Sequence, residues 1–166
     1  MIDNGLQIRE AKSKDFPQIW QLLEPVFKKG DSYPHPPDMT KEDAFHAWME
    51  IPTATYIVIK NKEIIGTYYI KTNQIGLGSH VCNCGYVVGE AARGYGLGRI
   101  MCEHSKRQAK KLGYKAMQYN LVVSTNEVAV HLWKSCGFEL IGTLPKAFNH
   151  LEKGFVDAHV MYLWLD

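Results

Sequence analysis

Four glycines and two arginines stand close together in GEAARGYGLGRI, residues 89–100. Glycine has no Cβ, so a glycine-rich backbone can approach a ligand closely. A helix that begins here would direct unpaired N–H groups and the positive end of its dipole toward an anion. Arg93 and Arg99 would add side-chain charge suited to phosphate. The stretch therefore predicts a phosphate-binding turn, with an ordinary glycine-rich turn and solvated arginines as the alternative.

Neither of the two familiar nucleotide-binding loops matches this stretch. A P-loop requires Gly-Lys followed by Ser or Thr, and the chain has no such string. A dinucleotide fingerprint G-x-G-x-x-G that starts at Gly94 requires glycine at position 99, which is arginine. One that starts at Gly96 requires glycine where Met101 stands. Neither loop is therefore present, and only the general expectation of an anion at a helix N-terminus remains.

His80, Cys82 and Cys84 alternate, so on a strand all three side chains share one face. Zinc binding needs a fourth ligand or a bound water, and no Cys-x-x-Cys pair or partner motif is present. Small buried thiols on a strand are the simpler interpretation, and no metal is predicted. The two cysteines as acyl-carrying nucleophiles are a minor alternative, because no partner base is evident. His80 and His131 are candidate bases, although a structural or surface role is the more common one for histidine.

The pattern of apolar residues predicts eleven elements around these residues. One helix should end or kink near Leu23, because Pro25 cannot continue it, while Thr40 should cap the next helix with Asp43 in a capping-box position. Residues 144–153 read as a loop. The predicted strands are 6–11, 55–60, 63–72, 81–89, 115–124, 139–143 and 154–165, and the predicted helices are 14–27, 40–50, 96–112 and 125–138. This order favours an α/β domain with a mixed sheet and helices on both faces.

Composition bounds the function classes. The 166 residues fit one domain (1–166), and the charge of +2 is dispersed without the basic patch that nucleic-acid binding needs. No segment has the apolar length of a membrane span, and the N-terminus lacks the apolar run of a signal peptide. A cytoplasmic protein with reduced cysteines is therefore expected, with no nucleic-acid or membrane partner.

Two motifs together carry a family resemblance. Residues 93–98, RGYGLG, fit the R/Q-x-x-G-x-G/A motif of the GNAT superfamily of acyl-CoA N-acyltransferases. The later segment NEVAVHLWKSCGFELIG, 126–142, is similar to the superfamily's N-x-x-A-x-x-L-Y-x-x-x-G-F-x-x-x-G pattern. The resemblance covers essentially the whole chain. It implies a mixed, mostly antiparallel, twisted sheet of about seven strands with helices on both faces.

The resemblance implies that acetyl-CoA is the cofactor and that acetyl transfer proceeds by direct attack in a ternary complex, with CoA as product. A backbone N–H near Val87 is the expected donor to the thioester oxygen. The pantetheine arm would lie along the strand that contains these residues, adding main-chain hydrogen bonds. The implied cofactor-binding residues are Tyr86, Val87, Val88, Arg93, Gly94, Tyr95, Gly96, Leu97, Gly98, Arg99, Asn126, Trp133 and Lys134.

One position departs from the superfamily pattern. Many members have a tyrosine that is proposed to protonate the departing thiolate, and here that position is Trp133. An indole N–H has no usable proton-donating pKa. A thiol pKa of roughly 8.5 makes unaided departure of the thiolate tolerable. No general acid is therefore assigned, and a CoA-binding regulatory domain without turnover is an alternative of another class.

A narrower resemblance concerns the acceptor. SHVCNCGYVV, YNLVVSTN and GFVDAHVMYLWL are similar to the acetyltransferases of azetidine-2-carboxylate and related proline analogues. It implies that Asn83 and Asn120 position the substrate, because an amide can donate to a carboxylate and accept from an amine. Asn120 would lie inside an apolar strand, and buried asparagines satisfied by backbone are the alternative. Residues that would wall the acceptor pocket are Tyr33, His35, Phe148, Asn149 and His150.

The expected reaction is acetylation of the amino group of a small molecule, an amino acid or proline-like analogue. A protein N-terminus, a lysine or a drug amine is the alternative acceptor. The sequence leaves the oligomeric state open, a homodimer included.

Overall fold

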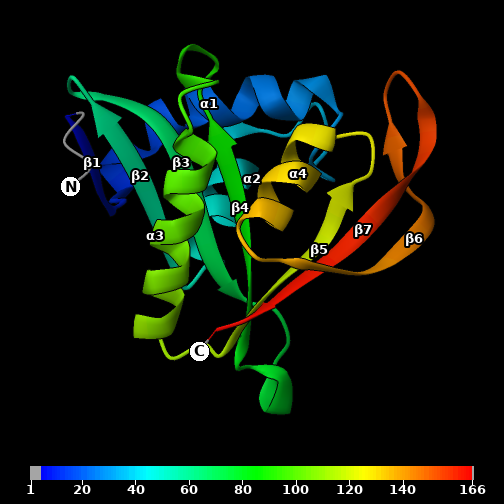
Figure 1. Cartoon of the computed structure of the whole chain (residues 1–166). Helices are drawn as coiled ribbons and strands as arrows, with labels where there is room; N and C mark the ends of the chain where they lie inside the picture. Colours follow the sequence, from blue (N-terminus) through cyan, green and yellow to red (C-terminus); the bar gives the residue numbers. More distant parts are fainter. Residues whose placement is uncertain (1–4, 166) are drawn as a thin grey trace.

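The computed structural model describes residues 5–165, and the chain forms one seven-stranded sheet with helices on both faces (Figure 1). The strands are β1 (Leu6–Glu10), β2 (Ala54–Lys60), β3 (Glu63–Thr72), β4 (Val81–Val88), β5 (Ala116–Val123), β6 (Glu139–His150) and β7 (Gly154–Trp164). The helices are α1 (Phe16–Lys29), α2 (Lys41–Phe45), α3 (Leu97–Lys111) and α4 (Glu127–Ser135). A turn of π-helix, His46–Glu50, extends α2. The predicted fold class is confirmed.

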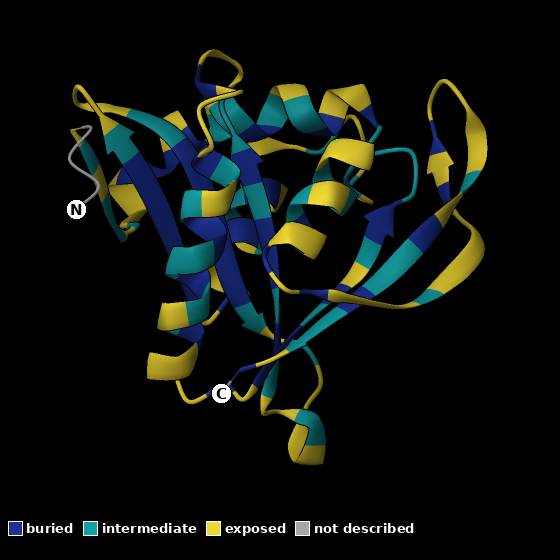
Figure 2. Ribbon diagram, in the orientation of Figure 1, coloured by how far each residue is buried: buried dark blue, intermediate teal, exposed yellow. Residues whose placement is uncertain are grey.

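The strand order is β1-β2-β3-β4-β5-β7-β6, antiparallel throughout except between β4 and β5. The alternation of side chains along β2, β3 and β4 separates two cores. One lies beneath α1 and α2 and includes Ile19, Trp48 and Ile57. The other lies beneath α3 and α4 and includes Tyr68 and Met101. Figure 2 shows the buried residues concentrated on the middle strands, whereas the far end of the β6–β7 hairpin is exposed.

The structure differs from the prediction at two boundaries, a helix end at Pro25 and the loop 144–153. Helix α1 continues through Pro25 to Lys29, where Gly30 ends it in the left-handed conformation. Proline removes one backbone hydrogen bond, but the burial of Phe27 (2% exposed) beyond it holds the last turn in place. The predicted loop 144–153 is instead mostly strand, because β6 pairs with β7 as far as His150. A bulge with Lys146 at φ 55° interrupts the alternation that the prediction relied on.

The parallel strands β4 and β5 separate soon after they begin. They pair only at Val81–Ala116 and Cys82–Met117. Beyond that point they diverge, and α4 lies against the space between them (Figure 1). The rest of β4, from Asn83 to Val88, therefore has one edge without a neighbouring strand, and this edge leads to the glycine-rich turn.

Candidate active site

The glycine-rich turn leaves a row of backbone N–H groups free. Helix α3 makes its first hydrogen bond from the Ile100 N–H to the Gly96 carbonyl. The N–H groups of residues 94–99 therefore have no acceptor within the described part of the chain. Gly94 and Gly96 have φ of 83° and 74°, in the left-handed region that glycine favours, and a Cβ on either would meet open space. The turn thus fits an anionic group such as a pyrophosphate.

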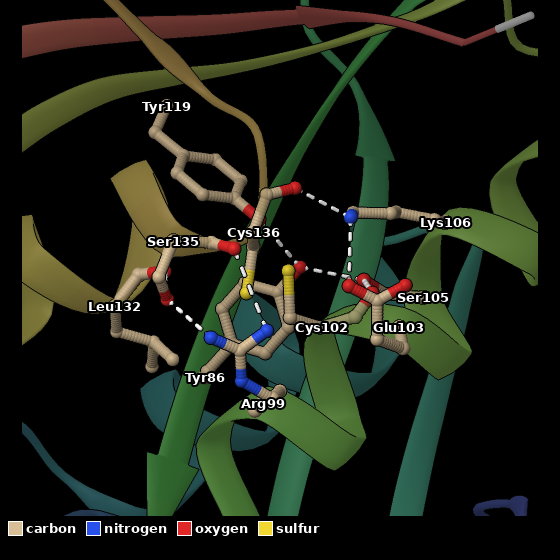
Figure 3. A network of polar contacts seen from close by, with 10 residues as sticks. All are labelled: Tyr86, Arg99, Cys102, Glu103, Ser105, Lys106, Tyr119, Leu132, Ser135 and Cys136. Carbon is tan, nitrogen blue, oxygen red and sulfur yellow. Dashed lines mark hydrogen bonds and ion pairs between the residues drawn. The ribbon is translucent and has the colours of Figure 1, made fainter.

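The side chains around this turn divide into exposed and structural ones. Arg93, Tyr95 and Lys134 are exposed, Tyr95 with Lys60 over its ring. Arg99, predicted to bind phosphate, donates to the Ser135 hydroxyl at 2.8 Å at the end of α4 (Figure 3). Leu97 is buried in the core.

Contacts between α3 and α4 fix the second helix beside the β4–β5 opening. Lys106 of α3 donates to the Cys136 carbonyl and pairs with Glu103 at 2.8 Å, as Figure 3 shows. A Cβ on Gly98 would lie 2.8 Å from a methyl group of Leu132. Gly98 therefore serves the close packing of the two helices. Asn126 caps α4 by accepting from the Ala129 N–H at 3.2 Å.

At the free edge of β4, the side chain of Tyr33 occupies the position that a neighbouring strand would take. The Tyr33 hydroxyl accepts from the Tyr86 N–H at 2.6 Å and donates to the Tyr86 carbonyl at 2.8 Å. Tyr33 comes from the segment between α1 and α2, and burial raises the pKa of its hydroxyl well above the usual value, so it stays protonated. This contact marks Tyr86 as a main-chain position that faces the opening.

The same geometry corrects the expected oxyanion donor. The Gly89 N–H donates to Ile65 of β3 at 2.8 Å, whereas the Tyr86 N–H faces the opposite way. Successive N–H groups along a strand alternate in direction. The N–H of Val87 therefore points toward β3, where Val87 is in register with Thr67, and it is not directed at the opening. Tyr86 and Val88 present theirs instead.

On the α3–α4 face, the side chain of Tyr86 lies in a closed polar chain. Its hydroxyl lies 2.7 Å from the hydroxyls of both Ser105 and Tyr119 (Figure 3). Trp133 packs against the rings of Tyr86 and Tyr119, each with a centroid separation of 4.9 Å. Its indole N–H has no hydrogen-bond partner among the described residues. Every fully buried side-chain nitrogen or oxygen of those residues does have a hydrogen-bond partner. The indole N–H is therefore not fully buried and reaches an accessible surface.

On the α1–α2 face, three polar groups lie close together. Asn83 of β4 is in register with Lys71 of β3, and the Lys71 ammonium lies 5.4 Å from the centre of the Tyr69 ring. That ring covers Gly85, where a Cβ would lie 2.6 Å from it. Sequence reasoning selected Asn83 but missed Lys71 and Tyr69. Only the pairing of β3 with β4 brings the three together.

His35 faces the same side from the segment between α1 and α2. Its ring lies 4.8 Å from that of Phe27 and is stacked with Tyr33 at 6.1 Å. Burial, and after it the charge of Lys71, lowers the pKa of His35 below its usual value. The imidazole is therefore neutral at neutral pH.

Asn120 does not lie in an apolar interior. It is exposed, at an irregularity in the β5–β7 register, and donates to Asn73 at 2.7 Å while accepting from Gln118 at 3.0 Å. The side chain points to the α1–α2 face, as Asn83 does, because Tyr119 faces the other core. The structure thus brings both predicted asparagines to one face of the sheet.

The remaining predicted residues have structural surroundings. Cys82 and Cys84 are buried in the core under α3 and α4, where burial raises the pKa of the Cys84 thiol, against a nucleophilic role. No group of three His, Cys, Asp or Glu side chains within residues 5–165 is arranged to hold a metal ion. His150 is buried and accepts from the N–H groups of Glu152 and Lys153 in the β6–β7 turn. The other predicted candidates are Phe148, which is buried, His80, beside Trp164, and His131 and Asn149, which are exposed.

The tip of the β6–β7 hairpin lies against the end of α1. The Leu151 N–H donates to the Gly30 carbonyl at 3.2 Å.

The site combines a divided parallel pair of strands, a free β4 edge and a helix N-terminus with unpaired N–H groups. These features define a protein that binds a phosphate-bearing cofactor in extended form.

The comparisons with known proteins identify the family. The profile of the acetyltransferase (GNAT) family matches residues 16–138. The chain is 28% identical over 149 residues to the N-acetyltransferase aca1 of Schizosaccharomyces pombe, covering 79% of this chain and 71% of that protein. It is 37% identical to a GCN5-related N-acetyltransferase from Kribbella flavida, with a TM-score of 0.91 and coverage of 97% and 98%. The chain belongs to the GNAT family, and it is an acetyl-CoA-dependent N-acetyltransferase.

A more distant structure shares the fold. The chain is 20% identical to yncA of Salmonella typhimurium, a protein described as an acetyltransferase and solved with acetyl-CoA, with a TM-score of 0.85 and coverage of 98% and 95%.

None of the helices within residues 5–165 has the length and apolar composition of a membrane span.

Proposed function

We propose that the protein transfers the acetyl group of acetyl-CoA to the amino group of a small amino acid or proline-like analogue in the cytoplasm. The observation that carries the proposal is the position of Tyr86. Its N–H faces the β4–β5 opening, downstream of β4 lies the turn with free N–H groups, and Asn83 stands upstream on the same strand. One strand thereby connects a pyrophosphate site, an oxyanion donor and a polar acceptor surface.

The reaction needs an amine without its extra proton and a donor for the thioester oxygen. Acetyl-CoA supplies the activated acyl group. The acceptor nitrogen forms the new C–N bond as the C–S bond breaks, and the electron pair of that bond leaves with sulfur. The Tyr86 N–H, once released by Tyr33, donates to the oxygen that gains charge. Neutral His35 lies on the acceptor side and is suited to take the proton that the amine loses.

Trp133 limits what α4 contributes at the leaving group. Its accessible indole N–H can donate a hydrogen bond to a thiolate but cannot transfer its proton. A thiol pKa of roughly 8.5 allows the thiolate to leave without prior protonation. The proposal therefore includes no general acid.

A screen of acceptors by thiol release tests the proposal. Acetyl-CoA would be combined with proline, azetidine-2-carboxylate, glycine, a polyamine and a peptide with a free N-terminus, and the acetylated product would be identified by mass spectrometry. Acetylation of the free amino acids is the expected result. Acetylation of the peptide alone would indicate that the acceptor is a protein. Binding of acetyl-CoA with no turnover of any amine would favour a regulatory domain.

A further inference from the structure

We propose that Lys71 binds the carboxylate of the acceptor, together with Asn83, and so selects amines that carry an acid group. This inference rests on the proposed function. Lys71 is half-buried on β3, and within residues 5–165 its ammonium forms no ion pair or hydrogen bond. The ammonium lies over the face of the Tyr69 ring, 5.4 Å from its centre.

Other half-buried cations of the protein are paired, which makes Lys71 unusual. Lys106, with 18% of its side chain exposed, binds Glu103 and a carbonyl group. Arg9, with 33% exposed, forms a two-pronged ion pair with Asp15. Desolvating a charge without a partner is costly, so a lysine kept in this position is explained by a ligand that supplies the opposite charge.

The neighbours of Lys71 are also donors without acceptors. The amide of Asn83, opposite Lys71, and the hydroxyl of Tyr69 have no hydrogen-bond partner among the described residues, and neither group is sealed from solvent. Burial raises the pKa of Tyr69, so its hydroxyl remains a proton donor. An ammonium, an amide and a hydroxyl together suit a carboxylate.

Within residues 5–165, no aspartate or glutamate forms an ion pair with Lys71. His35, from the segment between α1 and α2, is neutral because burial and Lys71 both lower its pKa. The polar side chains that approach from β5 and from the end of β3 are the amides of Gln118, Asn120 and Asn73. The site therefore has a net positive charge, which attracts an anionic acceptor and repels a polyamine.

The spacing along β4 sets the distance between this site and the Tyr86 N–H. Asn83 precedes Tyr86 by three residues, roughly 10 Å at about 3.3 Å per residue. Within that interval the Tyr69 ring covers Gly85, and the Lys71 ammonium lies over the same ring. A carboxylate held there leaves an α-amine directed toward the Tyr86 N–H.

Matched acceptors and a matched lysine test the proposal. Lys71→Met removes the charge and retains most of the stem, whereas Lys115→Met removes an exposed charge that we place outside the site. For the first variant, kcat/KM with proline should fall about 10- to 100-fold, the range of a charge-assisted contact. Its kcat/KM with prolinamide and its Kd for acetyl-CoA should stay within about twofold. Lys71→Arg should retain part of the activity with proline, and Lys115→Met all of it.

The proposed role of Lys71 would be wrong if Lys71→Met lost kcat/KM equally with proline and with prolinamide, or lost none with proline. A binding measurement separates this failure from failure of the proposed function. N-acetylproline should bind the CoA-loaded wild-type protein by calorimetry and bind Lys71→Met about 10-fold more weakly. If no amine is acetylated but this difference is present, the carboxylate site stands and the catalytic proposal fails. If N-acetylproline binds both proteins equally or neither, the carboxylate site is wrong.

Discussion

In our proposal, the two ends of the β4 edge recognise ligands by different means. At the glycine-rich turn, the proposed donors are the main-chain N–H groups of residues 94–99, whereas the nearby Arg99 side chain serves the packing of α3 against α4. On the acceptor side, the proposed donors are the side chains of Lys71, Asn83 and Tyr69, contributed by two strands. The first site depends on backbone conformation over one short segment. The second depends on strand register, so its composition can change without altering the fold.

The largest effect should follow a change of backbone conformation at the turn. Gly96→Ala introduces a side chain at φ 74°. The strain of the left-handed region, about 1–2 kcal/mol, should shift the turn and misdirect its N–H groups. We expect the Kd for acetyl-CoA to rise about 10- to 100-fold by calorimetry, the equivalent of one or two charge-assisted hydrogen bonds.

Gly113→Ala is the matched control for that variant. Gly113 has φ 90°, lies in open space and follows the other end of the same helix. Both variants should lose similar stability in denaturant, and only Gly96→Ala should lose affinity. Equal affinities in the two variants would mean that the cofactor does not depend on this backbone geometry, and the contrast between the two ends of β4 would disappear.

A smaller effect is expected where a side chain meets the main-chain edge. The Tyr33 hydroxyl occupies the Tyr86 N–H, at 2.6 Å, that the thioester oxygen needs in our mechanism. Tyr33→Phe removes this competitor, so the Kd for acetyl-CoA should fall about 3- to 10-fold, the equivalent of about 1 kcal/mol. The Kd for CoA, which lacks the acyl oxygen, should not change. Comparing the two ligands by calorimetry measures the competition directly.

An equal change for both ligands would point to a general rearrangement of the segment between α1 and α2. Weaker binding of acetyl-CoA alone would mean that Tyr33 donates to the acyl oxygen and does not compete with it. Either result would contradict the proposed competition, and the second would place the Tyr33 side chain on the cofactor side of the comparison.

The predictability of each region from sequence follows from the same contrast. Residues 93–98 and 126–142 are contiguous, and their glycines and caps determine local conformation, so both motifs could be recognised without a structure. The element order followed from periodicity and turn residues in the same way. The boundary errors at Pro25 and at residues 144–150 occurred where tertiary burial and a β-bulge override local preferences.

The acceptor side was less predictable because it depends on the register between strands and on the direction of main-chain N–H groups. Lys71 becomes a candidate only when β3 pairs with β4 and places it opposite Asn83. The direction of the Val87 N–H depends on which neighbours β4 has along each edge. A residue's position in a motif also does not determine its environment. Trp133 is buried, whereas Asn120, expected inside an apolar strand, is exposed.

The smallest effect is expected from Asn120→Ala. This exposed side chain accepts from Gln118 and donates to Asn73. Both the oxygen and the nitrogen of its amide therefore already have a hydrogen-bond partner within the protein. Removing it should loosen that chain of amides at the edge of the acceptor surface and raise KM for proline about threefold, because an exposed hydrogen bond contributes little. The Kd for acetyl-CoA and kcat should stay as in the wild type. Steady-state kinetics with proline measure the first effect and calorimetry the second. A loss of acetyl-CoA affinity without a change in KM would instead assign Asn120 to the cofactor, and the division between a main-chain site and a side-chain site would fail at this strand.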